Sequence, residues 1–224
     1  MNGGEVQSRS ANSSLVLPQP SRDGAHSLEQ ALFERCSVRE FSRLPLSLAE
    51  VSQLLWAAQG RVSRDGRRTA PSAGALYPLE LSLVAGNVRE LAAGVYRYEP
   101  AEHRIACMAT GDCRGALAEA ALGQAWIEEA PAVLTIAAVE RRVTRKYGQR
   151  GVRYVHIEAG HAGQNALLQA VALGLGAAPV GAFDDEAVRA IAGLRRDERP
   201  LYLIVIGRSR YKGSLPAVAR ERVR

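Results

Sequence analysis

The segment from Val152 to Leu175 reads VRYVHIEAGHAGQNALLQAVALGL and is rich in Ala, Leu and Gln. Apolar residues fall on nearly every side of the helix that this segment would form, a pattern typical of a helix covered all round. We therefore expect a central helix that is buried within the protein or at a subunit interface.

Strands are predicted on both sides of this helix. The runs from Ala132 to Val139 and from Leu201 to Ile206 are continuously apolar, as in strands buried on both faces. Leu79 to Ala85 reads as a further strand, and two short strands are predicted at Val95 to Tyr98 and Arg104 to Met108.

Capping residues mark the starts of other helices. Ser27-Leu28-Glu29-Gln30 and the segment from Ser47 to Glu50 both have the form of a capping box. The first of these helices is expected to end near Ser37. Residues 112–130 and 184–191 are also helical in pattern.

The length of the chain suits one domain. Its 224 residues are 47% hydrophobic and 23% charged, which is sufficient for a buried core. Residues 1–26 are rich in Ser, Asn, Gly and Pro and predict a flexible N-terminal arm; residues 27–210 form the domain and residues 211–224 a basic C-terminal tail. Strands and helices alternate loosely around a hairpin region, which indicates an α+β or mixed α/β class.

Composition disfavours several classes of function. No apolar run approaches the roughly 18 residues of a membrane span, and no signal pattern opens the chain, so we expect a cytoplasmic protein without a membrane partner. The formal charge is +6, but only 5% of residues are aromatic, which argues against a nucleic-acid partner. The three cysteines form no CxxC pair, and His156 and His161 do not have zinc-helix spacing, so no disulfide framework or metal site is expected.

A candidate anion site lies at Arg35-Cys36-Ser37-Val38-Arg39. Two guanidinium groups with a hydroxyl between them can converge on a phosphate, which guanidinium binds through charge-assisted hydrogen bonds. The alternative is a solvated helix end, where arginines complement the helix dipole.

Two other segments favour close approach of a ligand to backbone. Residues 71–78 read PSAGALYP, in which small residues between prolines would admit a flat ligand; the alternative is a tight surface turn. Residues 174–182 read GLGAAPVGA and follow a helix rather than a strand, so they do not form a dinucleotide fingerprint. They indicate a helix that ends at a left-handed glycine and then exposed backbone able to hydrogen-bond a ligand.

Five segments in this order resemble the nitroreductase family, and specifically its SagB/ThcOx-type dehydrogenase branch. They are RCSVREF (35–41), PSAGALYPLEL (71–81), KYGQRGVRYVHIEAGHAGQN (146–165), LGLGAAPVGAF (173–183) and LIVIGR (203–208). The resemblance implies the α+β fold of that family, a mostly antiparallel central sheet flanked by helices, in an intertwined homodimer.

The resemblance also implies FMN as the cofactor, bound between the two subunits. The residues implied to hold its phosphate and ribityl region are Arg35, Ser37, Arg39 and Arg208. Those implied to reach it from the other subunit are Pro71, Ser72, Ala73 and Gly74, and those implied to face the isoalloxazine near N5 are Pro179, Val180, Gly181 and Ala182. Cys36 departs from the family pattern, which usually has arginine there, and so weakens one phosphate contact.

Lys146 and Tyr147 stand where that branch has a catalytic Lys-Tyr pair. The implied reaction oxidises thiazolines or oxazolines to aromatic azoles, and it needs a base to remove a proton while a hydride leaves. A lysine becomes a usable base when burial or a cationic neighbour lowers its pKa, and Arg145 is adjacent in sequence. The alternative is an exposed pair in a loop that leads into a helix.

Three functions stay open on this basis. The first is an azoline dehydrogenase acting on a small-molecule or modified-peptide substrate. The second is an NAD(P)H-dependent reductase of nitro compounds or quinones, and the third is a non-catalytic flavin-binding scaffold in a biosynthetic complex. No peptide-recognition domain accompanies these motifs, so a compact, standalone relative is expected.

Overall fold

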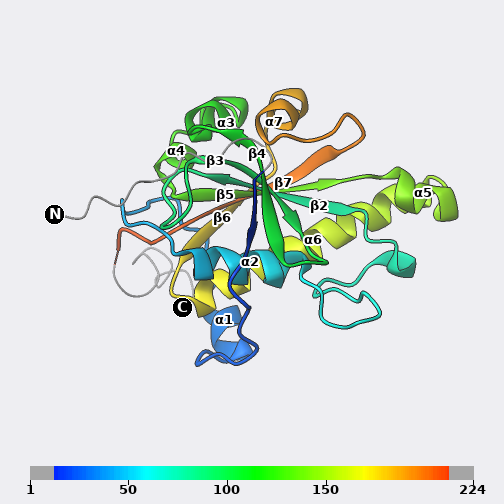
Figure 1. Ribbon diagram of the computed structural model, residues 1–224, viewed down its shortest axis with the longest axis horizontal. Coiled ribbons are helices and arrows are strands. Elements are labelled where there is room, and N and C mark those ends of the chain that lie inside the picture. The colour runs from blue at the N-terminus through cyan, green and yellow to red at the C-terminus, as the bar shows by residue number, and fades with distance from the viewer. Residues whose placement is uncertain (1–12, 212–224) are drawn as a thin grey trace, which may run out of the picture.

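One antiparallel sheet organises residues 13–211, the part of the chain that the computed structural model describes (Figure 1). Its seven strands run in the order β1-β4-β3-β2-β5-β7-β6, and each pair of neighbours is antiparallel. The strands are β1 (Ser14–Val16), β2 (Leu79–Ala85), β3 (Gly94–Glu99), β4 (Arg104–Thr110), β5 (Ala132–Ala138), β6 (Gly176–Val180) and β7 (Arg199–Gly207).

Helices cover both faces of this sheet, which makes the fold α+β as expected (Figure 1). They are α1 (Leu28–Glu34), α2 (Leu48–Gln59), α3 (Arg114–Ala120), α4 (Trp126–Glu129), α5 (Arg141–Tyr147), α6 (Arg150–Ala172) and α7 (Asp185–Ile191), with a 3-10 turn, η1 (Ala73–Ala75). None of the helices between residues 13 and 211 combines the length and the apolar character that a membrane span needs.

The alternation of side chains along the strands produces two cores. Leu79, Leu81 and Leu83 of β2 point to the face covered by α2 and α6, whereas Val84 points to the face covered by α3, α4 and α7. Every residue of β5 is buried, because this central strand has helices on both sides.

Several predicted elements are confirmed. Strand β2 has the predicted bounds, and β3, β4, β5 and β7 lie where strands were predicted. Both capping boxes form: Ser27 and Ser47 accept the N–H of Gln30 and Glu50, and each partner side chain accepts from the cap in return. Asp184 caps α7 through the N–H of Ala187.

The central helix is confirmed as α6, which is packed on one side only within this chain. Its inner stripe includes the buried Val155, Ala159 and Ala162, whereas His156 and Ile157 on the other side are exposed. The sequence of α6 is apolar on nearly every side, but the single chain covers only one side of the helix.

The structure corrects some boundaries. The first helix ends at Glu34, before Ser37, and the helical region 112–130 is two helices separated by Leu122 and Gly123, both at positive φ. Residues 176–180, expected as irregular backbone, form strand β6 against β7, although Gly174 does end α6 in the left-handed conformation.

The expected flexible arm, residues 1–26, is structured in its described part. Strand β1 pairs with β4, and the Ser21 N–H donates to Gln53 Oε1 of α2 at 2.8 Å. Residues 1–12 lie outside the described residues, as does the expected basic tail beyond Tyr211.

Candidate functional site

The chain leaving α1 lies against the edge strand β6 and the end of β7. Ser37 forms a parallel bridge with Ala177, and the Val38 N–H donates to the Ala177 carbonyl at 3.0 Å. The Ser42 N–H donates to the Arg208 carbonyl at 2.8 Å. These contacts place the Arg35–Arg39 segment and Arg208 at the same edge of the sheet, although they are far apart in sequence.

A glycine permits this close approach. A Cβ on Gly176 would lie 2.7 Å from Val38 Cβ, so a larger residue in β6 would push the Arg35–Arg39 segment away. Position 176 is therefore fixed by packing of this segment on β6.

The arginines at this edge differ in their partners. Arg208 is paired with Glu50 at 2.7 Å, and the Arg39 guanidinium lies 5.8 Å from the Trp126 ring centroid. Arg35 is half-buried and has no ion pair within residues 13–211. Such incompletely neutralised guanidinium groups can bind phosphate.

Exposed backbone follows at the other end of β6. Pro179 is half-buried and Val180 is buried, while Gly181 and Ala182 are exposed, and their N–H groups make no hydrogen bond within residues 13–211. Gly181 lies four positions after Ala177 along the extended chain, which corresponds to about 13 Å. One strand thus joins the edge that carries the candidate phosphate-binding arginines to two backbone N–H groups that have no acceptor within residues 13–211.

A shallow hollow of about 360 Å³ adjoins Gly181. Its walls come from the exposed side of α6, from the loop after β6 and from the start of β7, with lining residues that include His156, Gly160, Phe183 and Tyr202.

A second group of residues surrounds the loop that contains η1. Gly74 has φ +63°, and a Cβ placed there would lie 2.8 Å from the Tyr147 hydroxyl and 3.0 Å from Lys146 Nζ. The predicted loop and the predicted Lys-Tyr pair, some seventy residues apart in the printed sequence, are therefore in direct contact.

Lys146 and Tyr147 form the last turn of α5, not a loop. Tyr147 packs edge-on against Tyr154 of α6 with ring centroids 5.3 Å apart, and Lys146 is exposed with Nζ 5.4 Å from the Tyr147 ring centroid. Aromatic packing thus fixes Tyr147, while the lysine amine is free to approach a ligand.

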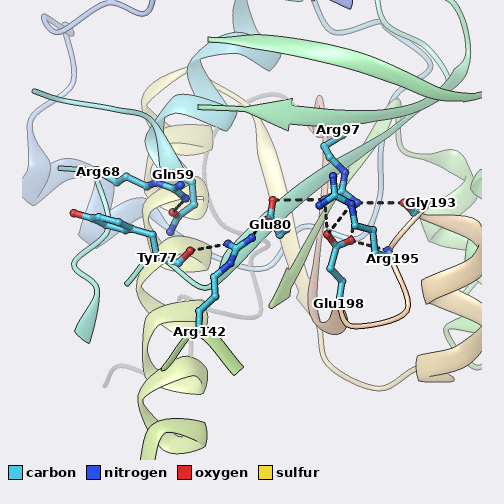
Figure 2. Close-up of polar contacts among 9 residues, drawn as sticks. All are labelled: Gln59, Arg68, Tyr77, Glu80, Arg97, Arg142, Gly193, Arg195 and Glu198. Atoms are coloured by element: carbon cyan, nitrogen blue, oxygen red, sulfur yellow. Dashed lines mark hydrogen bonds and ion pairs between the residues drawn. The ribbon is translucent and has the colours of Figure 1, made fainter. Parts of the chain in front are cut away.

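A polar network, missed by the sequence analysis, supports this loop (Figure 2). Arg68 donates to Gln59 Oε1 at 2.9 Å and lies over the Tyr77 ring, and Arg142 donates to the Tyr77 carbonyl at 3.0 Å. Arg142 is also paired with Glu80 of β2 at 2.5 Å. Figure 2 shows how these side chains hold the end of the loop against the sheet and α5.

The same network continues into the core. Glu80 lies 3.5 Å from Arg97, which binds both carboxylate oxygens of the fully buried Glu198 at 3.0 and 2.6 Å. The sequence offered no signal for these pairs because its arginines are numerous and scattered, and only the fold brings these to carboxylates.

The nitroreductase family model matches residues 32–208, which include both groups of residues. The chain belongs to the nitroreductase family. Members of this family are FMN-dependent oxidoreductases, so the chain is a flavin-dependent enzyme.

Individual nitroreductase relatives agree with this assignment. A Methanocaldococcus jannaschii protein described as a nitroreductase is 48% identical over 181 residues, covering 81% of this chain and 90% of its own length. A nitroreductase structure from Ralstonia eutropha JMP134 has a TM-score of 0.77 at 30% identity, covering 88% of this chain and 90% of that one. A chain of the E. coli microcin synthetase McbBCD complex, solved with truncated pro-MccB17 bound, has a TM-score of 0.71 at 25% identity, covering 93% of this chain and 79% of that one.

The donors of this nitroreductase chain fit FMN. The guanidinium groups at the β6 edge match a phosphate, and the N–H groups of Gly181 and Ala182, which have no acceptor within residues 13–211, match the acceptors of a flavin ring. Arg35, Ser37, Arg39 and Arg208 would hold the phosphate end. The roles of these individual residues stay predictions.

Proposed function

We propose that this nitroreductase-family chain is an azoline dehydrogenase, which oxidises thiazolines or oxazolines to azoles. The observation that carries the proposal is the contact between Gly74 and both Lys146 and Tyr147. It puts an amine and a phenol beside the small-residue loop that the family resemblance assigns to the flavin. The likeness to a chain of microcin synthetase, whose structure holds a peptide, supports a peptide-borne heterocycle as substrate.

The reaction removes two hydrogens from the heterocycle. FMN, when bound, supplies the two-electron chemistry that takes up one of them as a hydride. The other leaves as a proton, for which Lys146 Nζ as a neutral amine, or the Tyr147 oxygen as a phenolate, is the acceptor. Molecular oxygen, or another two-electron acceptor, takes the electrons away and completes the cycle.

The exposure of Lys146 bears on this role. Its amine is exposed in the single chain, so the burial that would favour a neutral amine has to come from the partner subunit, the cofactor or the substrate. We infer a homodimer in which the loop and the Lys-Tyr pair of one subunit complete the flavin site on the β6 edge of its partner.

A second function is favoured by the relatives themselves. The Methanocaldococcus and Ralstonia proteins are described as nitroreductases. Reduction of nitro compounds or quinones by NAD(P)H needs the same flavin site but has no need of the Lys146-Tyr147 pair.

The two functions are separated by anaerobic reduction of the purified yellow protein. We expect a synthetic thiazoline peptide to bleach the flavin and to lose two hydrogens by mass spectrometry, while NADPH bleaches it slowly. Rapid bleaching by NADPH, with no change in the thiazoline, would replace the dehydrogenase proposal by the reductase.

Lys146→Ala tests the proton acceptor. We expect azole formation to fall by about 100-fold, the range of a lost general base, while bound FMN stays at the wild-type amount. Arg145→Ala is the matched control, because it removes the neighbouring exposed cation of the same helix. Equal losses in both variants would reduce Lys146 to a contributor of surface charge.

A further inference from the structure

Glu158 is a buried carboxyl for which the contacts within residues 13–211 provide no hydrogen bond. It lies on the inner side of α6 and is 2% exposed, and neither of its oxygens has a hydrogen-bond partner there. An unpartnered buried carboxyl costs folding free energy. It therefore calls for an explanation beyond packing.

Two side chains of the segment before η1, a loop that packs on α6, act electrostatically on this carboxyl. Burial raises the pKa of Glu158 to about 7, and the Ser72 hydroxyl and the Arg68 guanidinium act against that rise. Arg68 is engaged with Gln59 and with the Tyr77 ring. Glu158 lacks a hydrogen-bond donor, and of these two side chains Ser72 is the one that can supply a neutral donor, its hydroxyl.

Ser72 has a proton to give. Its Oγ accepts the Tyr77 N–H at 2.9 Å, which closes the loop on itself. A hydroxyl that accepts one hydrogen bond still has its own O–H to donate. Donation to Glu158 would join the closed loop to α6.

We propose that Glu158 is a positioning residue that accepts a hydrogen bond from Ser72 and so anchors the 72–77 loop in front of Lys146 and Tyr147. Gly74 of this loop contacts both side chains, so a shift of the loop would change the position of Lys146 and Tyr147 relative to the substrate. Misplacement of reacting groups by about 1 Å can lower a rate by about 100-fold. The anchoring is tested without any turnover, whereas its effect on turnover rests on the proposed function.

Hydrogen exchange of the Tyr77 amide measures the anchor directly, in the full chain with its flavin bound. Glu158→Met fills the same space without an acceptor, and we expect it to speed this exchange at least 10-fold. Glu158→Gln keeps an acceptor oxygen and should restore exchange to near the wild-type rate. Ser82→Ala is the control, because it alters another buried side chain that has no hydrogen-bond partner within residues 13–211, on the opposite face of the sheet.

A double variant of Glu158 and Ser72 tests whether Glu158 acts on the loop through Ser72. Ser72→Ala removes the acceptor of the Tyr77 N–H, so it must also speed exchange. If Glu158 acts through Ser72, the double variant exchanges no faster than Ser72→Ala alone. The proposal is overturned if the two substitutions multiply each other's effect on the Tyr77 exchange rate in the double variant. It is also overturned if Glu158→Met leaves the exchange rate of the Tyr77 amide unchanged.

Turnover separates this inference from the proposed function. We expect Glu158→Met to retain FMN and to lower the rate of thiazoline oxidation with little change in KM, and Glu158→Gln to recover it. If the wild-type protein oxidises no thiazoline, the dehydrogenase proposal fails. The hydrogen exchange of the Tyr77 amide still tests the Ser72–Glu158 hydrogen bond in that case.

Discussion

Gly74 is the residue at which backbone conformation and candidate chemistry meet. Its φ of +63° disfavours any side chain, and its missing Cβ leaves room for the ends of Lys146 and Tyr147. Gly74→Ala should lower the free energy of unfolding in urea by about 1–2 kcal/mol and should also reduce turnover. The matched control is Gly66→Ala, because Gly66 has φ +91° and open space around it. It should show the loss of stability without the loss of turnover, and equal turnover in both variants would contradict the assignment.

Glu158 makes a second prediction at this scale, in the pH dependence of stability. Burial raises its pKa in the fold from 4.5 to about 7, against Ser72 and Arg68, so ionisation above pH 4.5 favours the unfolded chain. Wild-type stability is therefore lost progressively as pH rises through about 7. The melting temperature of Glu158→Gln should exceed that of the wild type by a small amount at pH 5 and by more at pH 8.

The difference between the two proteins isolates this one group, because their other titrating groups are shared. Glu119→Gln, a change at an exposed carboxyl on α3, should track the wild type at every pH. A constant difference between Glu158→Gln and the wild type from pH 5 to 8 would contradict the prediction.

At the scale of elements, the start of α2 is stabilised by Glu50, whose carboxylate contacts two different residues. Glu50 accepts a hydrogen bond from the Ser47 N–H with one oxygen, at 2.7 Å, and binds Arg208 with the other. Ser47→Ala should lower the free energy of unfolding by about 1 kcal/mol in a denaturant titration. Ser27→Ala, at the exposed seven-residue α1, should cost less because less of the fold depends on that helix. The reverse order would mean that the box at Ser47 contributes little.

Elements with strong local signals could be predicted, and those that depend on partners could not. Continuous apolar runs and capping residues identify β5, β7, α2 and α6, because burial and helix ends both leave a recognisable pattern in the local sequence. Strand β6, with the sequence GAAPV, lacks such a signal and is a strand because β7 pairs with it. Its Pro179 is tolerated since β6 is the edge strand.

The same division holds for the candidate site. The short motifs predicted which segments bear donors and anion-binding side chains, but not the buried Glu158 or the Arg142–Glu80 pair. Those residues lie within helices and strands of ordinary composition, and only tertiary contact gives them a partner or denies them one. Buried charge pairs such as Arg97 and Glu198 belong to this class, for which spacing in sequence carries no information.

At the scale of the whole molecule, the candidate site is divided between two places. Arg35, Arg39 and Gly181 lie along β6, and Lys146 and Tyr147 lie beside the Gly74 loop; no hydrogen bond or ion pair within residues 13–211 joins one group to the other. We infer that each active site takes one group from each of two subunits. The exposed side of α6, with Ile157 49% exposed, and the exposed Leu32 and Phe33 of α1 offer apolar surface for the dimer.

Mixing two inactive variants tests this division. In a dimer of Lys146→Ala with Arg35→Ala/Arg39→Ala, one site receives both defects and the other receives none. Random reassortment of equal amounts should therefore restore about a quarter of wild-type azole formation, because half of the dimers are mixed and each has one intact site. The control is either variant mixed with itself, which has no route to an intact site. If the mixture stays as inactive as its components while native mass spectrometry shows mixed dimers, both groups act within one subunit and the shared-site arrangement is wrong.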